Sequence, residues 1–305
     1  MQSNERKMQC IAFIGFGEAG GTLGSDLAKA CDVRTYDILI ATSARAALGF
    51  KAQAAHVTLC ESLAEAVEGA DIVISAVTAS AAHDVAVSTA KFIKSDQLFL
   101  DINSVSPETK RQNARVIEAT GASYVEVAVM APIPPQRLRA PMLLGGQQAK
   151  FVEQQLRLLG MNATAVSEQI GVASAIKMCR SIMIKGLEAL AIESLFAARR
   201  YGAEDAVLAS LHASFPSLGW AAEFPDYLIS RVAEHGRRRA AEMREVVRTL
   251  EDVKQRPLMA AATAIRHDAL VDDMSAAACE YDPSKPFSWR DLADRLAVSA
   301  NQIPK

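Results

Sequence analysis

The segment AIKMCRSIMIKGLEAL, residues 175–190, places several reactive side chains in otherwise apolar sequence. On a helix, at about 100° per residue, these polar side chains share one sector and the remaining arc is apolar. They are Lys177, Arg180, Ser181, Lys185 and Glu188. A lysine can serve as a general acid or base when burial and a neighbouring cation lower its pKa. The alternative is an amphipathic helix whose polar side faces water.

A glycine-rich turn near the N-terminus is the second candidate site. Gly15-Phe16-Gly17-Glu18-Ala19-Gly20 lies between an apolar, β-rich run and a helical pattern, and Asp37 ends the next β-rich run. In a GxGxxG turn the first glycine permits a tight turn, the second lets a pyrophosphate approach the backbone, and the third lets the helix pack on the strand. An acid about twenty residues further on can bind a ribose diol. These seven residues therefore predict a dinucleotide-binding turn; the alternative is that the glycines only shape a loop.

The cofactor expected at this turn is NAD, because the carboxylate of Asp37 disfavours the additional phosphate of NADP. Arg45 could bind that phosphate, although it could equally lie on a solvated helix. NADP therefore stays possible.

Small polar residues follow two further β-rich runs. One run ends at Val77 and Thr78, and the other is followed by Asn103 and Ser104 in the segment DINSVSP. In a doubly wound sheet, the loops after the C-terminal ends of the strands line the ligand crevice. We therefore expect Val77, Thr78 and Asn103 to contact the cofactor and Ser104 to face the substrate.

The elements that would position these residues alternate between strand and helix in the first half of the chain. Strands are predicted at IAFIG, VRTYD, near HVTL, at DIVISAV, LFLDI, YVEVAV and PMLLG, and at 163–166. Helices are predicted at 20–31, 61–68, 80–93 and 107–120, the last with Ser106 as its N-cap. This alternation predicts an α/β Rossmann domain over residues 1–168, in which a doubly wound, mostly parallel sheet carries helices on both faces.

The second half of the chain carries helical patterns at 170–200, 203–213, 227–250 and 257–270, separated by the breaks FPSLGW and KQRP. We therefore expect an all-helical C-terminal domain over residues 169–305, for substrate binding and dimerisation. The helix at about 170–200 would connect the two domains, and its polar stripe would line a cleft between them.

Composition excludes several classes of protein. The chain of 305 residues is 50% hydrophobic with a formal net charge of −2, which gives no general attraction to nucleic acid or anionic lipid. The five cysteines are scattered without metal-ligand spacing, which indicates reduced thiols and no metal site. The N-terminus lacks a signal-peptide pattern, and charges interrupt every long apolar stretch. We expect a cytoplasmic protein that binds neither nucleic acid nor membrane.

The stretch EHGRRRAAEMREV concentrates basic side chains. On a helix, Arg238, Glu242 and Glu245 could form ion pairs at i,i+3 and i,i+4, as on a solvated surface. Alternatively, His235, Arg238 and Arg239 could bind a carboxylate or phosphate, for which the guanidinium fork is suited.

Three motifs together resemble the β-hydroxyacid dehydrogenase superfamily, which includes 3-hydroxyisobutyrate and 6-phosphogluconate dehydrogenases. They are the glycine turn, the DINSVSP segment, and GVASAIKMCRS at 171–181, and the resemblance covers nearly the whole chain. The chain most resembles a poorly characterised phosphogluconate-dehydrogenase-like branch with its own helical C-terminal domain. The resemblance implies that Lys177 is the general acid/base and that the protein is a homodimer. A similar HGxRRAxEM pattern in this branch favours anion binding by His235 and Arg238.

Some positions differ from the better-known members of this superfamily. Ser181 replaces the asparagine usually found four residues after the lysine, and Ile184 replaces the second acid of phosphogluconate dehydrogenases. The segment MAPIPP replaces the glycine pair of the substrate loop. The resemblance therefore implies a dehydrogenase without identifying its substrate, and oxidative decarboxylation of 6-phosphogluconate is not expected.

These features predict an NAD(P)-dependent oxidoreductase that interconverts a small β-hydroxy acid and its oxo acid. Lys177 would move the proton, with Ser181 as a second catalytic residue. Five side chains would bind the anionic substrate: Ser104, Arg180, Lys185, His235 and Arg238. Lys185 could instead pair with Glu188 or Glu193 on the surface. The alternatives for the whole protein are an imine reductase-like enzyme and a non-catalytic dinucleotide-binding protein.

Overall fold

The computed structural model describes residues 9–302 of the chain. The chain divides into two compact units, the first ending at Lys177 and the second beginning at Met178. Residues 1–8, on which the expectation about a signal peptide depends, lie outside the described residues. Within the described range, no helix is both long and apolar enough to cross a membrane.

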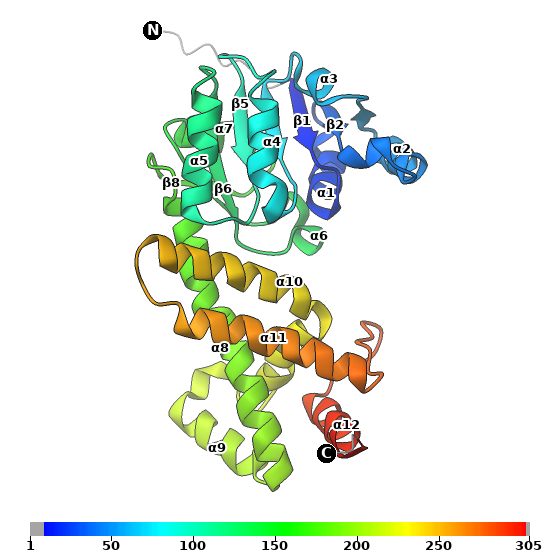
Figure 1. Cartoon of the computed structure of the whole chain (residues 1–305), viewed down its shortest axis with the longest axis vertical. Coiled ribbons are helices and arrows are strands. Elements are labelled where there is room, and N and C mark those ends of the chain that lie inside the picture. Colours follow the sequence, from blue (N-terminus) through cyan, green and yellow to red (C-terminus); the bar gives the residue numbers. More distant parts are fainter. Residues whose placement is uncertain (1–8, 303–305) are drawn as a thin grey trace. The chain divides into compact units, whose positions relative to one another are not determined.

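An eight-stranded sheet forms the centre of the first unit, in the order β3-β2-β1-β4-β5-β6-β7-β8 (Figure 1). Its strands are β1 (Cys10–Ile14), β2 (Asp32–Tyr36), β3 (Thr58–Leu59), β4 (Ile72–Ser75), β5 (Leu98–Asp101), β6 (Ser123–Val129), β7 (Met142–Gly145) and β8 (Ala163–Ser167). Neighbouring strands are parallel except β6 and β7, which are antiparallel. Every predicted strand is present, and the mostly parallel Rossmann-like fold is confirmed.

The sheet has a buried core on each face. Ile11 and Phe13 of β1 belong to one buried cluster, whereas Cys10, Ala12 and Ile14 belong to another. Successive side chains of a strand point to opposite faces, so a strand that is buried throughout contributes to both clusters. Burial on both faces explains why β1 is continuously apolar rather than alternating.

Seven α-helices accompany these strands. They are α1 (Glu18–Leu27), α2 (Arg45–Ala54), α3 (Leu63–Val67), α4 (Ala82–Thr89), α5 (Pro107–Glu118), α6 (Ile133–Gln136) and α7 (Ala149–Leu158). The predicted helices correspond to α1, α3, α4 and α5, whereas α2, α6 and α7 were not predicted. The N-cap prediction at α5 is confirmed, because the Ser106 hydroxyl accepts a hydrogen bond from the Thr109 amide at 3.3 Å and Pro107 begins the helix.

The second unit is all-helical, as predicted. Helix α8 (Val172–Tyr201) begins in the first unit and is followed by α9 (Glu204–Ser214), α10 (Phe224–Asp252), α11 (Leu258–Ala276) and α12 (Trp289–Gln302), the last of which was not predicted. Helices α10 and α11 run side by side (Figure 1). Their close approach depends on Gly236, where an added Cβ would lie 2.5 Å from Val271 Cγ2.

Candidate active site

The glycine turn between β1 and α1 has the geometry that a bound pyrophosphate needs. Gly15 has a φ of +96°, and an added Cβ would lie 2.4 Å from the carbonyl oxygen of Ala76. An added Cβ at Gly20 would lie 2.2 Å from the Gly15 carbonyl oxygen. At Gly17, by contrast, no atom of the described residues other than Gly17 and its two chain neighbours lies within 4 Å of an added Cβ. Close packing therefore requires the first and third glycines, and the second leaves the backbone open to a ligand.

Asp37 lies at the end of β2 and holds this turn. Its Oδ2 accepts a hydrogen bond from the Phe16 amide at 2.7 Å, and its Oδ1 accepts one from the Leu39 amide at 3.0 Å. Glu18 and Ala19 are the first residues of α1, directly after the turn. The structure therefore brings together all seven residues that the sequence assigned to the dinucleotide-binding turn.

Lys51, on the unpredicted helix α2, also contacts the glycine turn. Its ammonium donates hydrogen bonds to the carbonyl oxygens of Phe16 at 2.5 Å and Gly17 at 2.7 Å. Burial lowers the pKa of Lys51, and the nearby carboxylate of Asp37 opposes that shift. Arg45, the arginine considered for an NADP phosphate, pairs instead with Glu61 at 2.6 Å, and both side chains are exposed.

Asn103 links the loops after β4 and β5. Its Oδ1 accepts a hydrogen bond from the Val77 amide at 2.7 Å, and its Nδ2 donates to Ser75 Oγ at 2.9 Å. Thr78, in the same loop as Val77, is bonded through its hydroxyl to Ser80 at 3.1 Å. Asn103 is buried, so these bonds fix the loop that was expected to contact the cofactor.

The fully buried carboxylate of Asp101 holds Asn103 in place. Asp101 Oδ1 accepts hydrogen bonds from Asn103 Nδ2 at 2.8 Å and from the Lys110 ammonium at 2.8 Å. Its Oδ2 accepts from Asn113 at 3.0 Å and from the Tyr124 hydroxyl at 2.8 Å. Burial alone would raise the pKa of Asp101, but the charge of Lys110 and these hydrogen bonds outweigh it and hold the pKa below its usual value.

Lys177 and Ser104 meet within the first unit. Lys177 Nζ donates a hydrogen bond to Ser104 Oγ at 2.5 Å, although the two residues are 73 positions apart in the chain. Ser104 directly follows Asn103, which places the lysine beside the loop after β5. Two of the residues predicted to act on a substrate are therefore in direct contact.

The rest of the polar face of α8 lies within the second unit and is largely buried. Lys185 donates a hydrogen bond to Ser181 Oγ at 3.2 Å and pairs with Glu242 of α10 at 2.9 Å. Glu188, 1% exposed, accepts hydrogen bonds from Nε and Nη2 of Arg239, with Nε 2.7 Å from Oε2. The alternative of a surface pair for Lys185 is wrong, and the alternative of a solvated face is wrong for Ser181, Lys185 and Glu188, which are all buried, whereas Arg180 on the same face is exposed.

Electrostatics around Glu188 reflect this burial. Burial raises the pKa of Glu188, and the charge of Arg239 only partly opposes the shift. His267 of α11 is fully buried, with Nε2 3.7 Å from Glu188 Oε2. Burial and the charges of Arg239 and Lys185 lower the pKa of His267 to about 4. His267 is therefore neutral at pH 7.

Much of the basic stretch on α10 is ion-paired within the second unit. Arg237 and Arg244 both pair with Asp268 of α11, and Arg239 binds Glu188. His235 lies 3.3 Å from Glu234 at a kink in the helix, where its own φ of −132° is not helical. Two of the predicted substrate-binding residues, Arg180 and Arg238, have exposed side chains.

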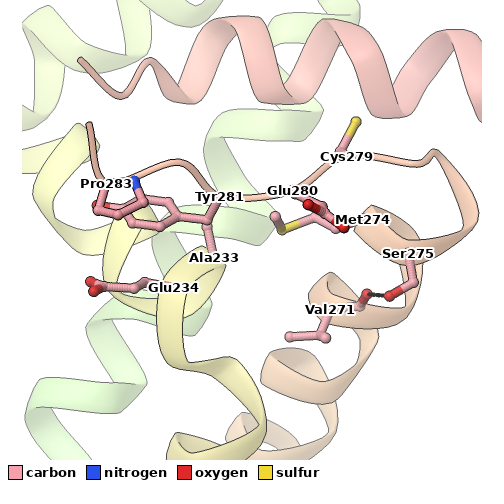
Figure 2. A pocket seen from close by; sticks show the side chains of 9 residues that line it. All are labelled: Ala233, Glu234, Val271, Met274, Ser275, Cys279, Glu280, Tyr281 and Pro283. Atoms are coloured by element: carbon pink, nitrogen blue, oxygen red, sulfur yellow. Dashed lines mark hydrogen bonds between the residues drawn. The ribbon is translucent and has the colours of Figure 1, made fainter. Parts of the chain in front are cut away.

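A cavity of about 430 Å³ lies in the second unit, near the kink in α10 and the C-terminal end of α11 (Figure 2). Figure 2 shows Glu234, Tyr281 and Glu280 among the side chains that line it. Glu234 is already paired with Arg231 and His235. None of the residues predicted to act in catalysis or binding lines this cavity.

Two family comparisons match the two units. Residues 10–171 match the family described as the NAD binding domain of 6-phosphogluconate dehydrogenase. Residues 198–270 match a domain of unknown function (DUF1932).

Individual proteins extend this similarity over most of the chain. A conserved hypothetical protein from Sinorhizobium meliloti 1021 is 37% identical, with 96% of this chain and 97% of that one covered and a TM-score of 0.81. A conserved protein of unknown function, described as structurally similar to 3-hydroxyacid dehydrogenases, is 31% identical over 86% of this chain and 97% of its own, with a TM-score of 0.73. The mitochondrial 3-hydroxyisobutyrate dehydrogenase of Drosophila melanogaster is 26% identical over 70% of this chain and 65% of that protein.

Proposed function

The chain belongs to the β-hydroxyacid dehydrogenase superfamily, and we propose that it is an NAD(P)-dependent oxidoreductase that interconverts a small β-hydroxy acid and its oxo acid. The observation that carries this proposal is the hydrogen bond from Lys177 to Ser104, next to Asn103 at the end of β5. Loops at the C-terminal ends of strands are where sheets of this kind bind their ligands.

Lys177 would move the proton of the reaction. When bound, the nicotinamide would accept the hydride from the hydroxyl-bearing carbon or return it to the carbonyl carbon. In the oxidative direction, a neutral Lys177 takes the proton of the substrate hydroxyl; in the reductive direction, its ammonium gives a proton to the carbonyl oxygen. Because Ser104 accepts a hydrogen bond from Lys177, its own hydroxyl proton is available to the substrate.

Further residues would orient the substrate. The Ser181 hydroxyl lies one turn along α8 from Lys177. Arg180 has an exposed guanidinium that can form two parallel hydrogen bonds to a substrate carboxylate. Lys185 is paired with Glu242, so we assign it to holding Ser181 rather than to direct contact with a substrate anion. Anion binding by His235 and Arg238 stays a prediction.

NAD is the proposed physiological cofactor. Asp37 places a carboxylate at the end of β2, where a ribose diol would bind and a phosphate would be repelled. The pairing of Arg45 with Glu61 supports the same choice, since the arginine is already engaged with a carboxylate.

The proposal is tested by following nicotinamide absorbance over a panel of 3-hydroxy acids, plain and phosphorylated, with NAD and NADP. We expect Lys177→Ala to lower kcat by about 10²- to 10⁴-fold while NADH binding persists. Lys150→Ala, at a 76% exposed side chain of α7, is the matched control. Undiminished turnover in Lys177→Ala would remove this lysine from the mechanism. A silent panel in the wild type would favour imine reduction or a non-catalytic role.

We also propose that the protein is a homodimer. Helix α11 carries Leu258, Met259 and Ile265 with exposed apolar side chains, and exposed apolar surface of this kind marks association sites. Light scattering of the purified protein measures the mass directly. A monomeric mass at micromolar concentration would reject the dimer without affecting the proposed reaction.

A further inference from the structure

We propose that Glu126, a buried carboxylate to which the sequence assigned no role, is a positioning residue for Lys177. The inference rests on the proposed function, in which Lys177 moves the proton. Glu126 lies on β6, whereas Lys177 lies on α8, and the contacts between them run through the first turn of that helix. All of these residues belong to the first unit.

Four hydrogen bonds join the Glu126 carboxylate to the start of α8. Oε1 accepts from the amides of Gly171 at 2.6 Å and Ala173 at 3.0 Å. Oε2 accepts from the Ser174 amide at 3.2 Å and from the Ser174 hydroxyl at 2.7 Å. The first amides of a helix have no partner within the helix, and here a single side chain satisfies three of them. Its negative charge also suits the positive end of the helix dipole.

The fold makes room for this carboxylate. Gly145 of β7 lies directly opposite Glu126 in the sheet, and an added Cβ there would lie 2.5 Å from Glu126 Oε1. Gly171 has a φ of +103°, and an added Cβ would lie 2.4 Å from Arg111 Nη1. Two glycines that carry no side chain of their own are thus needed where the chain approaches Glu126.

Burial makes the bonds specific for a carboxylate. Glu126 is 0% exposed, so water does not replace a lost hydrogen bond at this position. A carboxylate offers only acceptors, which matches four donors. A glutamine of the same shape would turn an NH₂ group toward some of these donors and leave them unsatisfied.

Lys177 lies less than one helical turn beyond the residues that Glu126 binds. It is three residues after Ser174, and its Nζ reaches Ser104 at 2.5 Å. Ser104 follows β5, the strand paired with β6. Glu126 therefore fixes the start of α8 relative to the same part of the sheet that carries Ser104. A displacement of about 1 Å at a reacting group is enough to lower a rate by about 100-fold.

The test compares Glu126→Gln with the wild type, and Glu153→Gln is the matched control. Glu153 of α7 is also poorly exposed, but its partners are the surface residues Lys150 and Arg157. We expect Glu126→Gln to lower kcat by about 10- to 100-fold with the dissociation constant of NADH changed less than about 2-fold. In a Lys177→Ala background, Glu126→Gln should cause no further loss. A purely structural role would lower activity additively in both backgrounds and would overturn the proposal.

A second readout does not depend on turnover. The acetylation rate of Lys177 by a water-soluble N-hydroxysuccinimide ester, followed by mass spectrometry, should rise at least about 3-fold in Glu126→Gln, because the ammonium is no longer held on Ser104. If the wild type turns over no substrate, the proposed function fails, but this rate still decides the role of Glu126. An unchanged rate overturns it. Should Glu126→Gln fail to fold, Ser174→Ala, which removes one donor and keeps the carboxylate, provides the same comparison.

Discussion

Single side chains tie the glycine turn to distant parts of the first unit. Asp37 accepts a hydrogen bond from the Phe16 amide, and Lys51 donates to the carbonyl groups of Phe16 and Gly17. Because both donors and acceptors of the turn are engaged, its backbone is preorganised before a ligand arrives. Preorganisation of this kind increases affinity by lowering the entropic cost of binding.

Lys51→Met should therefore weaken dinucleotide binding without altering the fold. Removing two hydrogen bonds from a charged donor frees the carbonyl groups of the turn, and we expect the dissociation constant of NADH to rise about 3- to 10-fold. Fluorescence titration with NADH measures it. Lys29→Met is the control, since Lys29 is 73% exposed and, among the described residues, its ammonium bonds only to Asp26 of α1. Equal affinities for Lys51→Met and the wild type would show that the turn does not need this lysine.

His267 predicts how stability depends on pH. Its pKa is about 4 in the folded protein against 6.5 for an ordinary histidine. As pH falls from about 6.5 to 4, the imidazole is therefore protonated in the unfolded chain and stays neutral in the folded protein. Stability contributed by the neutral ring is thus lost over this window, by about 3 kcal/mol when complete. Glu188, whose pKa is raised above the ordinary 4.5, acts in the opposite direction within the same window, because the folded protein takes up that proton before the unfolded chain does as pH falls toward 4.5.

The measurement is urea unfolding of His267→Leu at pH 7.5, 5.5 and 4.5. Within the described residues neither ring nitrogen of His267 makes a hydrogen bond of normal geometry, and its contacts with the Lys185 backbone and Glu188 are weak, so leucine should be tolerated at pH 7.5. On acidification, the free energy of unfolding of His267→Leu should then fall less than that of the wild type. His212→Leu, at an exposed position of α9, is the comparison. Parallel curves for His267→Leu and the wild type would rule out His267 as the titrating group.

At the scale of elements, close helix packing in the second unit depends on one glycine. Gly236→Ala should destabilise the protein by about 1–3 kcal/mol, because the new Cβ would lie 2.5 Å from Val271 Cγ2 on α11. Gly186→Ala on α8 is the matched control, because, apart from its chain neighbours and the adjacent backbone of its own helix, no atom of the described residues lies within 4 Å of its added Cβ. There alanine should stabilise by about 0.5–1 kcal/mol through its higher helix propensity. Urea unfolding of both variants decides; a loss at both positions would point to helix geometry rather than packing.

Elements with local signals were predictable, and those held by distant partners were not. The apolar run of β1, the glycines of the turn and the Ser106-Pro107 cap of α5 each carry their signal within a few residues. Helices α2 and α7 lack comparably strong caps, and no side chain caps their N-termini in the structure. Boundaries without a capping residue leave only periodicity to locate a helix.

The same distinction applies to the candidate site. Lys177 was predictable because it lies in a recognisable segment, but the contacts that hold the candidate site and the polar face of α8 come from far along the chain. Lys51 lies 35 residues from Phe16, and Glu126 lies 45 residues from Gly171. Arg239 lies 51 residues from Glu188 and forms a buried ion pair with it, although the polar face of α8 was also compatible with exposure to solvent. Helical periodicity reports which residues share a face, and only the tertiary fold determines what covers that face.

At the scale of the whole molecule, each unit has its own hydrophobic core. The sheet of the first unit is buried between clusters that include Phe13 on one face and Phe99 on the other. The second unit is built around clusters that include Trp289 and Met243. Units with separate cores behave as domains that can unfold separately.

Ligand binding should therefore stabilise one unit selectively. The glycine turn and its supports, Asp37 and Lys51, all belong to the first unit, so NADH at about 100 times its dissociation constant should stabilise that unit by about 2.7 kcal/mol. In calorimetry, the transition of the first unit should move to higher temperature with NADH, and that of the second should stay in place. Gly236→Ala identifies the second transition, because its packing defect lies on α10 and α11. A single transition that NADH and Gly236→Ala both shift would show instead that the continuous helix α8 makes the two units unfold together.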